Sequence, residues 1–198
     1  MIHRLIHPFT RDQVEPLQAG DGVRLFGRIY TGRDRLHKHL FDGGASPVPL
    51  ADAALYHCGP VMMRENGGWK AVAAGPTTSI REEPYMAAVM ARHGVRVVIG
   101  KGGMGDATAR ACAELGGVYL EAVGGAAQVL ASCITRVRGV HFENEFGSAE
   151  AMWELDVADF PALVSIDAHG VNLHHRVEHE SKRALARLLA GRGRGGRS

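Results

Sequence analysis

The sequence has few cysteines and no long apolar run. Its 198 residues include three cysteines, Cys58, Cys112 and Cys133, which are odd in number, widely spaced and without a C-x-x-C pair. We therefore expect free thiols and no metal or iron-sulfur site made by this chain's own thiolates, although one cysteine could join a site shared with a partner. No apolar stretch approaches the ~18 residues that a membrane-spanning helix requires. The composition predicts a soluble globular protein without a membrane partner.

The sequence also has little net charge. The net charge is +2, and the six basic residues after Ser181 have no acidic neighbour in that segment, so residues 1–181 are net −4. A mildly acidic body does not predict a nucleic-acid-binding surface. The last residues, 191–198, read GRGRGGRS and are expected to form a basic disordered tail behind one domain over residues 1–190. The amino-terminal segment lacks an apolar leader and a cleavage site, so a cytoplasmic location is expected.

What is present is an alternation of strand and helix patterns. Gly22–Tyr30 predicts a strand, followed by the polar helix pattern GRDRLHKHLFDGG. Two short strands, Ala54–Cys58 and Trp69–Ala73, are expected to pair as a hairpin around the Asn-Gly of RENGG. Beyond Gly75, the Val-rich strands VRVVIG and VYLEAV alternate with helices, and the strands TRVRGVHFE, AMWELDV and ALVSIDAHG precede a closing helix at Glu178–Ala190. Continuous apolar strands between helices predict a single mixed α/β domain whose sheet is covered on both faces.

The segment GPTTSIREEPY leaves a strand and enters a helix. Ser79 and Glu82 have the spacing of a capping box, and Pro84 fits the first turn. A helix start leaves backbone N–H groups unpaired at the positive end of the dipole, so it stabilises a carboxylate or phosphate. Arg81 adds a planar fork suited to carboxylate binding. An ordinary helix cap with a solvated arginine is the alternative, and it is preferred if the segment is taken alone.

A second polar group follows the first long strand. Arg33 and His37 are i, i+4 neighbours on the expected helix, with Asp34 between them. A solvated helix face explains the same pattern and is preferred in isolation. A histidine group near the C-terminus lacks the order H-E-x-x-H and a carboxylate third ligand, so we do not expect a metal there. That group comprises His174, His175 and His179.

The stretch VRVVIGKGGMGDATAR contains a literal G-x-G-x-x-G after an apolar run. Its glycines are Gly100, Gly102 and Gly105, and Glu121 lies close to where a dinucleotide site places an acidic residue. Lys101, however, lies inside the turn, where a dinucleotide needs only close approach of the backbone. A lysine at a strand end beside a glycine turn suits a small anion better. A nucleotide-binding module that uses Gly100–Gly105 is the alternative.

Five spaced motifs, read in order from Gly22 to Leu173, are more specific than any one loop. They are TGRDRLHKHL with YHCGP, GPTTSIR, VVIGKGGMG, GGAAQVLA and SAEAMWELDVADFPALVSIDAHG. The set resembles the β subunit of the iron-sulfur L(+)-tartrate dehydratases and, equally, the C-terminal domain of class I fumarases, which belong to one hydro-lyase family. The hairpin segment and the KGGMG glycines are slightly closer to the tartrate dehydratase subunit.

The resemblance implies a swivelling β/β/α domain with a mixed sheet, which partners a separate α subunit, commonly as α2β2. That α subunit carries the cysteine ligands of a 4Fe-4S cluster, one iron of which binds the substrate as a Lewis acid. The implied activity is reversible addition or removal of water on a C4 dicarboxylate, from tartrate to oxaloacetate or between fumarate and malate. The chain alone is expected to be inactive. A family fold that acts only as a non-catalytic interaction subunit is a further alternative.

The resemblance also assigns roles to single residues. Thr77 matches the threonine of the G-P-T-T motif that is proposed to handle the proton beside the leaving hydroxyl, and it needs a neighbouring acceptor that the sequence does not identify. Arg33, Arg81 and Lys101 match the cations that would clamp the far carboxylate, which makes Lys101 a catalytic candidate together with Thr77. Thr78 is a further substrate-binding candidate, and Asp34 and His37 would support the site.

Two positions depart from the family pattern. Cys58 replaces the alanine of the motif Y-x-A-G-P, so this thiol is a departure and not a metal ligand. Arg81-Glu82-Glu83 replaces the usual R-M-D. We expect Glu82 to point outward as the helix cap, because a negative charge in the pocket would disfavour a dicarboxylate.

Overall fold

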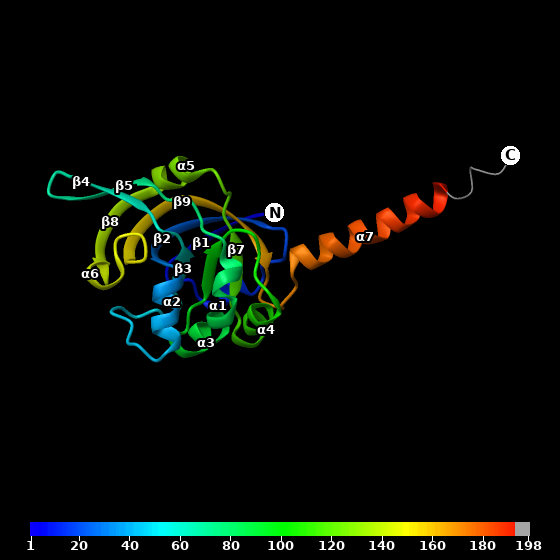
Figure 1. The fold of residues 1–198 in the computed structure, drawn as a ribbon, viewed down its shortest axis with the longest axis horizontal. Helices are drawn as coiled ribbons and strands as arrows, with labels where there is room; N and C mark the ends of the chain where they lie inside the picture. Colours follow the sequence, from blue (N-terminus) through cyan, green and yellow to red (C-terminus); the bar gives the residue numbers. More distant parts are fainter. Residues whose placement is uncertain (193–198) are drawn as a thin grey trace.

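The computed structural model describes residues 1–192, which fold into a strand-rich body and a long terminal helix (Figure 1). The elements in chain order are β1 (Ile2–Ile6), α1 (Arg11–Val14), β2 (Gly22–Gly32), α2 (Asp34–Phe41), β3 (Ala54–His57), β4 (Val61–Glu65), β5 (Gly68–Ala73), the 3-10 turn η1 (Ser79–Glu82), α3 (Glu83–His93), β6 (Val97–Gly100), α4 (Asp106–Leu115), β7 (Val118–Glu121), α5 (Ala127–Ser132), β8 (Ile134–His141), α6 (Glu143–Phe146), β9 (Met152–Ile166) and α7 (Leu173–Arg192). The mixed α/β class predicted from the sequence is confirmed.

Seven strands form one mixed sheet in the order β1-β2-β3-β6-β7-β9-β8. Strands β2, β3, β6 and β7 run parallel to one another. Strand β9 is antiparallel to both β7 and β2, so it closes these five strands into a ring. Because parallel strands end at a common edge, the loops after β2, β3 and β6 meet on one side of the ring.

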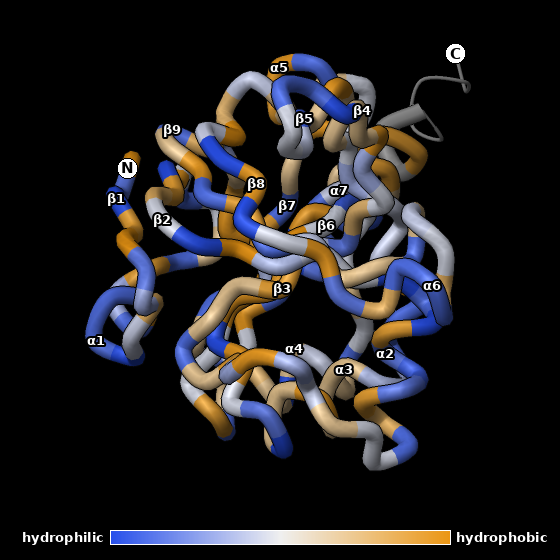
Figure 2. Tube along the Cα trace, turned by 90° about the vertical axis from the view of Figure 1, so that its left-hand side faces the viewer, coloured by the Kyte–Doolittle hydropathy of each residue, from blue (hydrophilic) through white to orange (hydrophobic). Residues whose placement is uncertain are grey.

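Alternate residues of the central strands face two different cores. In β3, Ala54 and Tyr56 belong to one apolar cluster, whereas Leu55 belongs to the other. The second cluster lies under α2, α3 and α4, which cover one side of the ring (Figure 1). Figure 2 shows α3 and α4 side by side next to the central strands, with β1 and α1 at the periphery. The prediction of strands that are buried on both faces is therefore confirmed.

The predicted hairpin has a different first strand. Strand β5 pairs with β4, and not with Ala54–His57, which lies in the middle of the large sheet. The Asn66-Gly67 turn has positive φ at both residues, as a two-residue hairpin requires. The sequence pattern missed Val61–Glu65 because this strand is largely exposed and lacks a buried apolar face.

The two strands predicted at 151–157 and 162–170 are one element, the 15-residue β9. Asp159 has a φ of 56°, and Pro161 follows it within the strand. These residues have the signature of a loop, but the pairing with β2 continues on both sides of them. They mark a local bend in a continuous strand, which is where sheets accept positive φ and proline. The first strand, Ile2–Ile6, was also missed, and it forms the parallel edge next to β2.

Helix α7 begins at Leu173, earlier than the predicted Glu178, and extends away from the body (Figure 1). Residues 191 and 192 of the predicted tail are its last two residues, and residues 193–198 lie outside the described part of the chain. Within residues 1–192, no helix combines the length and the apolar character needed to cross a lipid bilayer.

Candidate functional site

The candidate residues from three separate loops lie at the carboxyl edge of the parallel strands. Arg33 directly follows β2, and Lys101 directly follows β6. The GPTTSIR segment is joined to Lys101 by a β-bridge at Thr78. The Lys101 N–H donates to the Thr77 carbonyl at 3.3 Å, and the Ser79 N–H donates to the Lys101 carbonyl at 3.0 Å. Backbone pairing therefore fixes the threonine motif beside the lysine.

The three candidate cations differ in their partners. The Arg81 guanidinium lies 2.9 Å from the Asp34 carboxylate. Arg33 Nε lies 3.4 Å from a carboxylate oxygen of Glu150. Lys101 has no carboxylate within 4 Å among the described residues. Each guanidinium is thus oriented by one acid and keeps further N–H donors, while the ammonium is available to a ligand.

Ser79 does not form the expected capping box. Its hydroxyl, buried with the rest of the side chain, accepts a hydrogen bond from the Tyr119 phenol at 3.0 Å and lies 2.8 Å from His57 Nδ1. Since the serine hydrogen is then directed to Nδ1, the His57 ring carries its proton on Nε2. Burial holds the pKa of His57 well below its usual value, so the ring is neutral.

The hydrogen-bonded Tyr119, Ser79 and His57 side chains anchor the GPTTSIR segment to the strands beneath it. The His57 carbonyl accepts the Thr77 N–H at 2.7 Å, so the threonine is tied to the end of β3. A Cβ atom at Gly100 would collide with the Ser79 hydroxyl and lie 3.1 Å from His57 Nδ1. Glycine at position 100 is therefore needed for close packing of β6 against these side chains, and not for approach to a pyrophosphate.

Glu82 is buried and faces the site, so the expectation that it points outward is wrong. Its side chain is 0% exposed, and Oε2 lies 3.6 Å from His37 Nδ1. That nitrogen donates instead to the Arg33 carbonyl at 2.9 Å. Burial, followed by the nearby Asp34 carboxylate, raises the pKa of Glu82 to about 8, and burial lowers the pKa of His37 to about 4. Both groups are neutral at pH 7.

Glu82 was expected to cap the helix that follows Ser79. The neighbouring Glu83 acts as a helix cap instead, and the helix that it caps is α4. Its carboxylate accepts hydrogen bonds from the backbone N–H groups of Gly105, Ala107 and Thr108 at 2.8 to 3.1 Å. It also accepts the Thr108 hydroxyl at 2.7 Å. Glu83 thus satisfies the first turn of α4 from the start of α3, which joins these helices at the site's edge.

The remaining candidate residues are Thr77, Thr78 and His37. Thr77 Oγ1 is buried and has no hydrogen-bond partner among the described residues. Thr78 is exposed beside it. His37 and His57 lie edge to face, with their ring centroids 4.8 Å apart. Among the described residues, the groups without a partner at this edge thus include one buried hydroxyl, one ammonium and unused guanidinium donors, a set that can bind anionic oxygens and exchange a proton.

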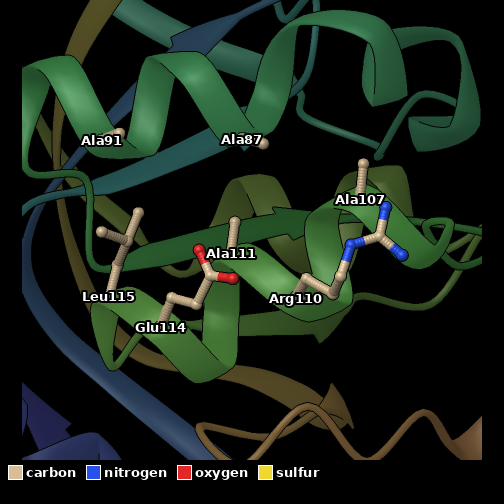
Figure 3. Close-up of a pocket in the computed structure, with 7 residues that line it drawn as sticks. All are labelled: Ala87, Ala91, Ala107, Arg110, Ala111, Glu114 and Leu115. Atoms are coloured by element: carbon tan, nitrogen blue, oxygen red, sulfur yellow. The ribbon is translucent and has the colours of Figure 1, made fainter.

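The glycine turn after Lys101 is held by side chains from two other elements. Glu121 accepts the Gly102 N–H at 3.1 Å, and its second oxygen lies 3.1 Å from His174 Nε2. The carboxylate that a dinucleotide site would direct to a ribose is therefore occupied by the loop itself. The groove between α3 and α4 contains none of the candidate residues and is lined mainly by alanines (Figure 3).

The thiols and histidines offer no metal centre within residues 1–192. The three cysteines are free, and burial raises the pKa of Cys58 to about 12. No group of three or more histidine, cysteine or acidic side chains in that part of the chain could hold a metal ion. His174 pairs with Glu121, and His175 lies 3.7 Å from Asp106.

Comparison with known proteins identifies the family. Residues 3–177 match the family model described as Fumarase C-terminus. The chain belongs to this family. The match runs from within β1 to the start of α7, and thus includes all of the candidate site.

Three relatives illustrate the breadth of the Fumarase C-terminus family. A Geobacillus stearothermophilus protein provisionally named class I fumarate hydratase is 54% identical over 182 residues, which are 91% of this chain and 35% of that protein. A Methanocaldococcus jannaschii protein provisionally named L(+)-tartrate dehydratase subunit beta is 36% identical over 91% of this chain and 95% of its own length. The Escherichia coli L(+)-tartrate dehydratase subunit beta is 34% identical over 85% of both chains. The chain thus spans about a third of the first relative and most of the other two.

Several residues of the site escaped sequence reasoning. Glu150, which orients Arg33, lies far from it in the chain, and no local spacing connects them. Tyr119 looks like an ordinary strand residue, because its hydroxyl partner comes from another loop. His57 did leave a signal: it is a polar residue in a strand whose four residues are all buried. Such a residue requires an internal partner, which here is Ser79.

Proposed function

We propose that this chain is the β-type subunit of a hydro-lyase that reversibly adds or removes water on a C4 dicarboxylate. The observation that carries the proposal is that the loops bearing the three candidate cations lie at the same edge of the sheet. Thr78 is bridged to Lys101, Arg81 is paired with Asp34 next to Arg33, and the Thr77 hydroxyl is buried without a partner among the described residues. Membership of the Fumarase C-terminus family supports it, because the relatives carry the names class I fumarate hydratase, given provisionally, and L(+)-tartrate dehydratase subunit beta.

The proposed roles follow from the contacts. Lys101 and the free N–H donors of Arg33 and Arg81 bind carboxylate oxygens and fix the orientation of the substrate. Asp34 orients Arg81 through the 2.9 Å ion pair. His37 supports Arg33 by donating to its backbone carbonyl.

Thr77 is the proposed proton-handling group. Its hydroxyl is buried without a partner among the described residues, while its backbone is fixed on both sides. A hydroxyl is a weak base at its ordinary pKa, so an acceptor must approach it when the complete site forms. We propose that this acceptor belongs to the partner subunit. Thr78, exposed next to it, would contact the same ligand.

The residues of this chain do not fit a 4Fe-4S cluster. Two of its three cysteines are buried, with pKa values raised to about 12 by burial, and within residues 1–192 no cluster of metal ligands exists. We propose that an α subunit carries the cluster and that the two chains assemble as α2β2. The beta-subunit names of two relatives support a partner, as does the first relative, whose length is mostly not covered by this chain. A cytoplasmic location remains part of this proposal.

The test is reconstitution. Co-expression with an α subunit under anaerobic conditions should yield turnover in a panel of L-malate, fumarate, both tartrates and mesaconate, and the preferred substrate identifies the enzyme. The isolated chain should be inactive in the same panel. Full activity of the isolated chain in the presence of a chelator would overturn the proposal, and so would a stable complex that turns over none of these acids.

A further inference from the structure

Glu82 is a buried carboxyl group without a counter-ion contact. Its side chain is 0% exposed, and neither oxygen meets the distance and angle of a hydrogen bond with any of the described residues. The Asp34 carboxylate is close enough to favour a proton on Glu82, because a hydrogen bond between two carboxyl groups requires one of them to be protonated. The nearest basic group, His37, directs its Nδ1 proton to the Arg33 carbonyl. A carboxylate in such surroundings would lose its hydration without gaining a partner, so the protonated acid is the favoured form.

The surroundings of Glu82 are the candidate substrate cations and their acids. From α2 it is faced by Asp34 and His37, from η1 by Arg81, and from the segment before β9 by Glu150. With Glu82 and His37 neutral, the three cations of the site, which include Lys101, outnumber its two other carboxyl groups, Asp34 and Glu150. Ionisation of Glu82 would add a third negative charge and cancel the excess.

We infer that Glu82 is a positioning residue that must carry a proton for the dicarboxylate to bind, so that substrate binding and protonation of this buried acid are coupled. The inference rests on the proposed function, because it concerns the same site. Glu82 touches no reacting atom in this account. It acts through the net charge next to Arg81 and Arg33, and therefore on KM and not on kcat.

The coupling predicts a specific pH dependence. The carboxyl titrates at a pKa of about 8, so the protonated fraction that is able to bind falls through this range. The apparent dissociation constant of the substrate scales with the inverse of that protonated fraction. KM for the preferred dicarboxylate should therefore rise about tenfold from pH 7 to pH 9, while kcat changes little.

Two neutral variants and one control test the inference in the reconstituted complex. Glu82→Gln and Glu82→Met cannot ionise, so they should keep the KM of the original protein at pH 7 and abolish its rise up to pH 9. Glu114→Gln changes an exposed carboxylate on α4 and should keep the rise. A KM that does not rise in the original protein, or that rises equally in both neutral variants, overturns the inference.

A second measurement requires neither turnover nor a variant. In the full-length chain labelled with 13C at the glutamate carboxyl carbons, one resonance should titrate with a midpoint near pH 8, several units above the ordinary value of ~4.3. Addition of L-malate or L-tartrate to the complex should raise that midpoint. Absence of an elevated midpoint overturns the inference, whereas an elevated midpoint in a complex without turnover overturns only the proposed function.

Discussion

The carboxyl edge of the sheet and the helical layer next to it satisfy their polar groups in opposite ways. Across the described residues, six of the ten buried side-chain atoms without a hydrogen-bond partner belong to Arg33, His37, His57, Thr77 and Glu82. In α3 and α4 and the loops that join them, Arg96 contacts Asp52 and the carbonyls that end α4, and Glu83 accepts the N–H groups that begin it. His93 Nε2 is the one unpaired buried side-chain atom of these two helices among the described residues. Native structures pair nearly all buried polar groups, so the unpaired groups of this edge support the proposal that a ligand or partner binds there.

The boundary between the two regions falls between two adjacent glutamates. Glu82 has no hydrogen-bond partner and faces the cations, whereas Glu83 makes four hydrogen bonds and faces α4. Their sequence neighbourhoods are nearly identical. The difference shows that charge type alone does not define a role here; the partners that folding supplies define it.

The largest expected effect is on activity at the unpaired edge. Lys101→Ala removes an ammonium that has no carboxylate partner among the described residues, so it should lower kcat/KM of the reconstituted complex by about a hundred- to a thousandfold with little change in thermal stability. Lys182→Ala, which removes an exposed lysine on α7, serves as the matched control. Equal activity of the two variants would contradict the proposed clamp.

The next largest effect is on stability in the paired region. Glu83→Ala leaves three backbone N–H groups and a buried threonine hydroxyl without their acceptor, so it should lower the free energy of unfolding by about 3 kcal/mol. Glu82→Gln, one residue earlier, should not destabilise the protein at pH 7. Urea denaturation of both variants at that pH measures the contrast, and an equal loss of stability would remove the distinction between these glutamates.

Sequence reasoning predicted the elements whose pattern reports their surroundings. The central strands were found because Val97–Gly100 and Val118–Glu121 are apolar runs buried on both faces. Strand β4 was missed because an exposed strand carries no such pattern. Strand β9 was divided at Asp159 because positive φ and proline look the same in a bend and in a loop.

The sequence likewise predicted those parts of the candidate site that lie in local motifs, and it missed those that depend on contacts between distant residues. The cations and Thr77 lie in motifs whose spacing is local, and the structure brings these motifs together. The orientation of Glu82 was wrong because capping-box spacing does not reveal that the Ser79 hydroxyl is already paired with His57 and Tyr119. Glu150 was missed because only the tertiary fold brings it to Arg33.

The smallest expected effect is a pH dependence of stability that separates Glu82 from the buried His37. The folded pKa of His37 is lowered from 6.5 to about 4, so its protonation in the unfolded chain destabilises the fold below pH 6.5, and stability rises with pH up to that point. The folded pKa of Glu82 is raised from 4.5 to about 8, so its contribution is fully present below pH 4.5 and is lost as pH rises from 4.5 to 8.

Between pH 6.5 and 8 only the Glu82 contribution still changes, and stability should fall there. The fall should be about 1 kcal/mol, since water at the edge of the site screens part of the charge. Unfolding free energies measured across this range should decline in the original protein and stay level in Glu82→Gln. Below pH 6.5 the buried histidines His37 and His57 make stability rise with pH in Glu82→Gln, whereas in the original protein the Glu82 contribution opposes that rise. A decline of equal size in Glu82→Gln would show that another group titrates in this range and that Glu82 is not the acid with the raised pKa.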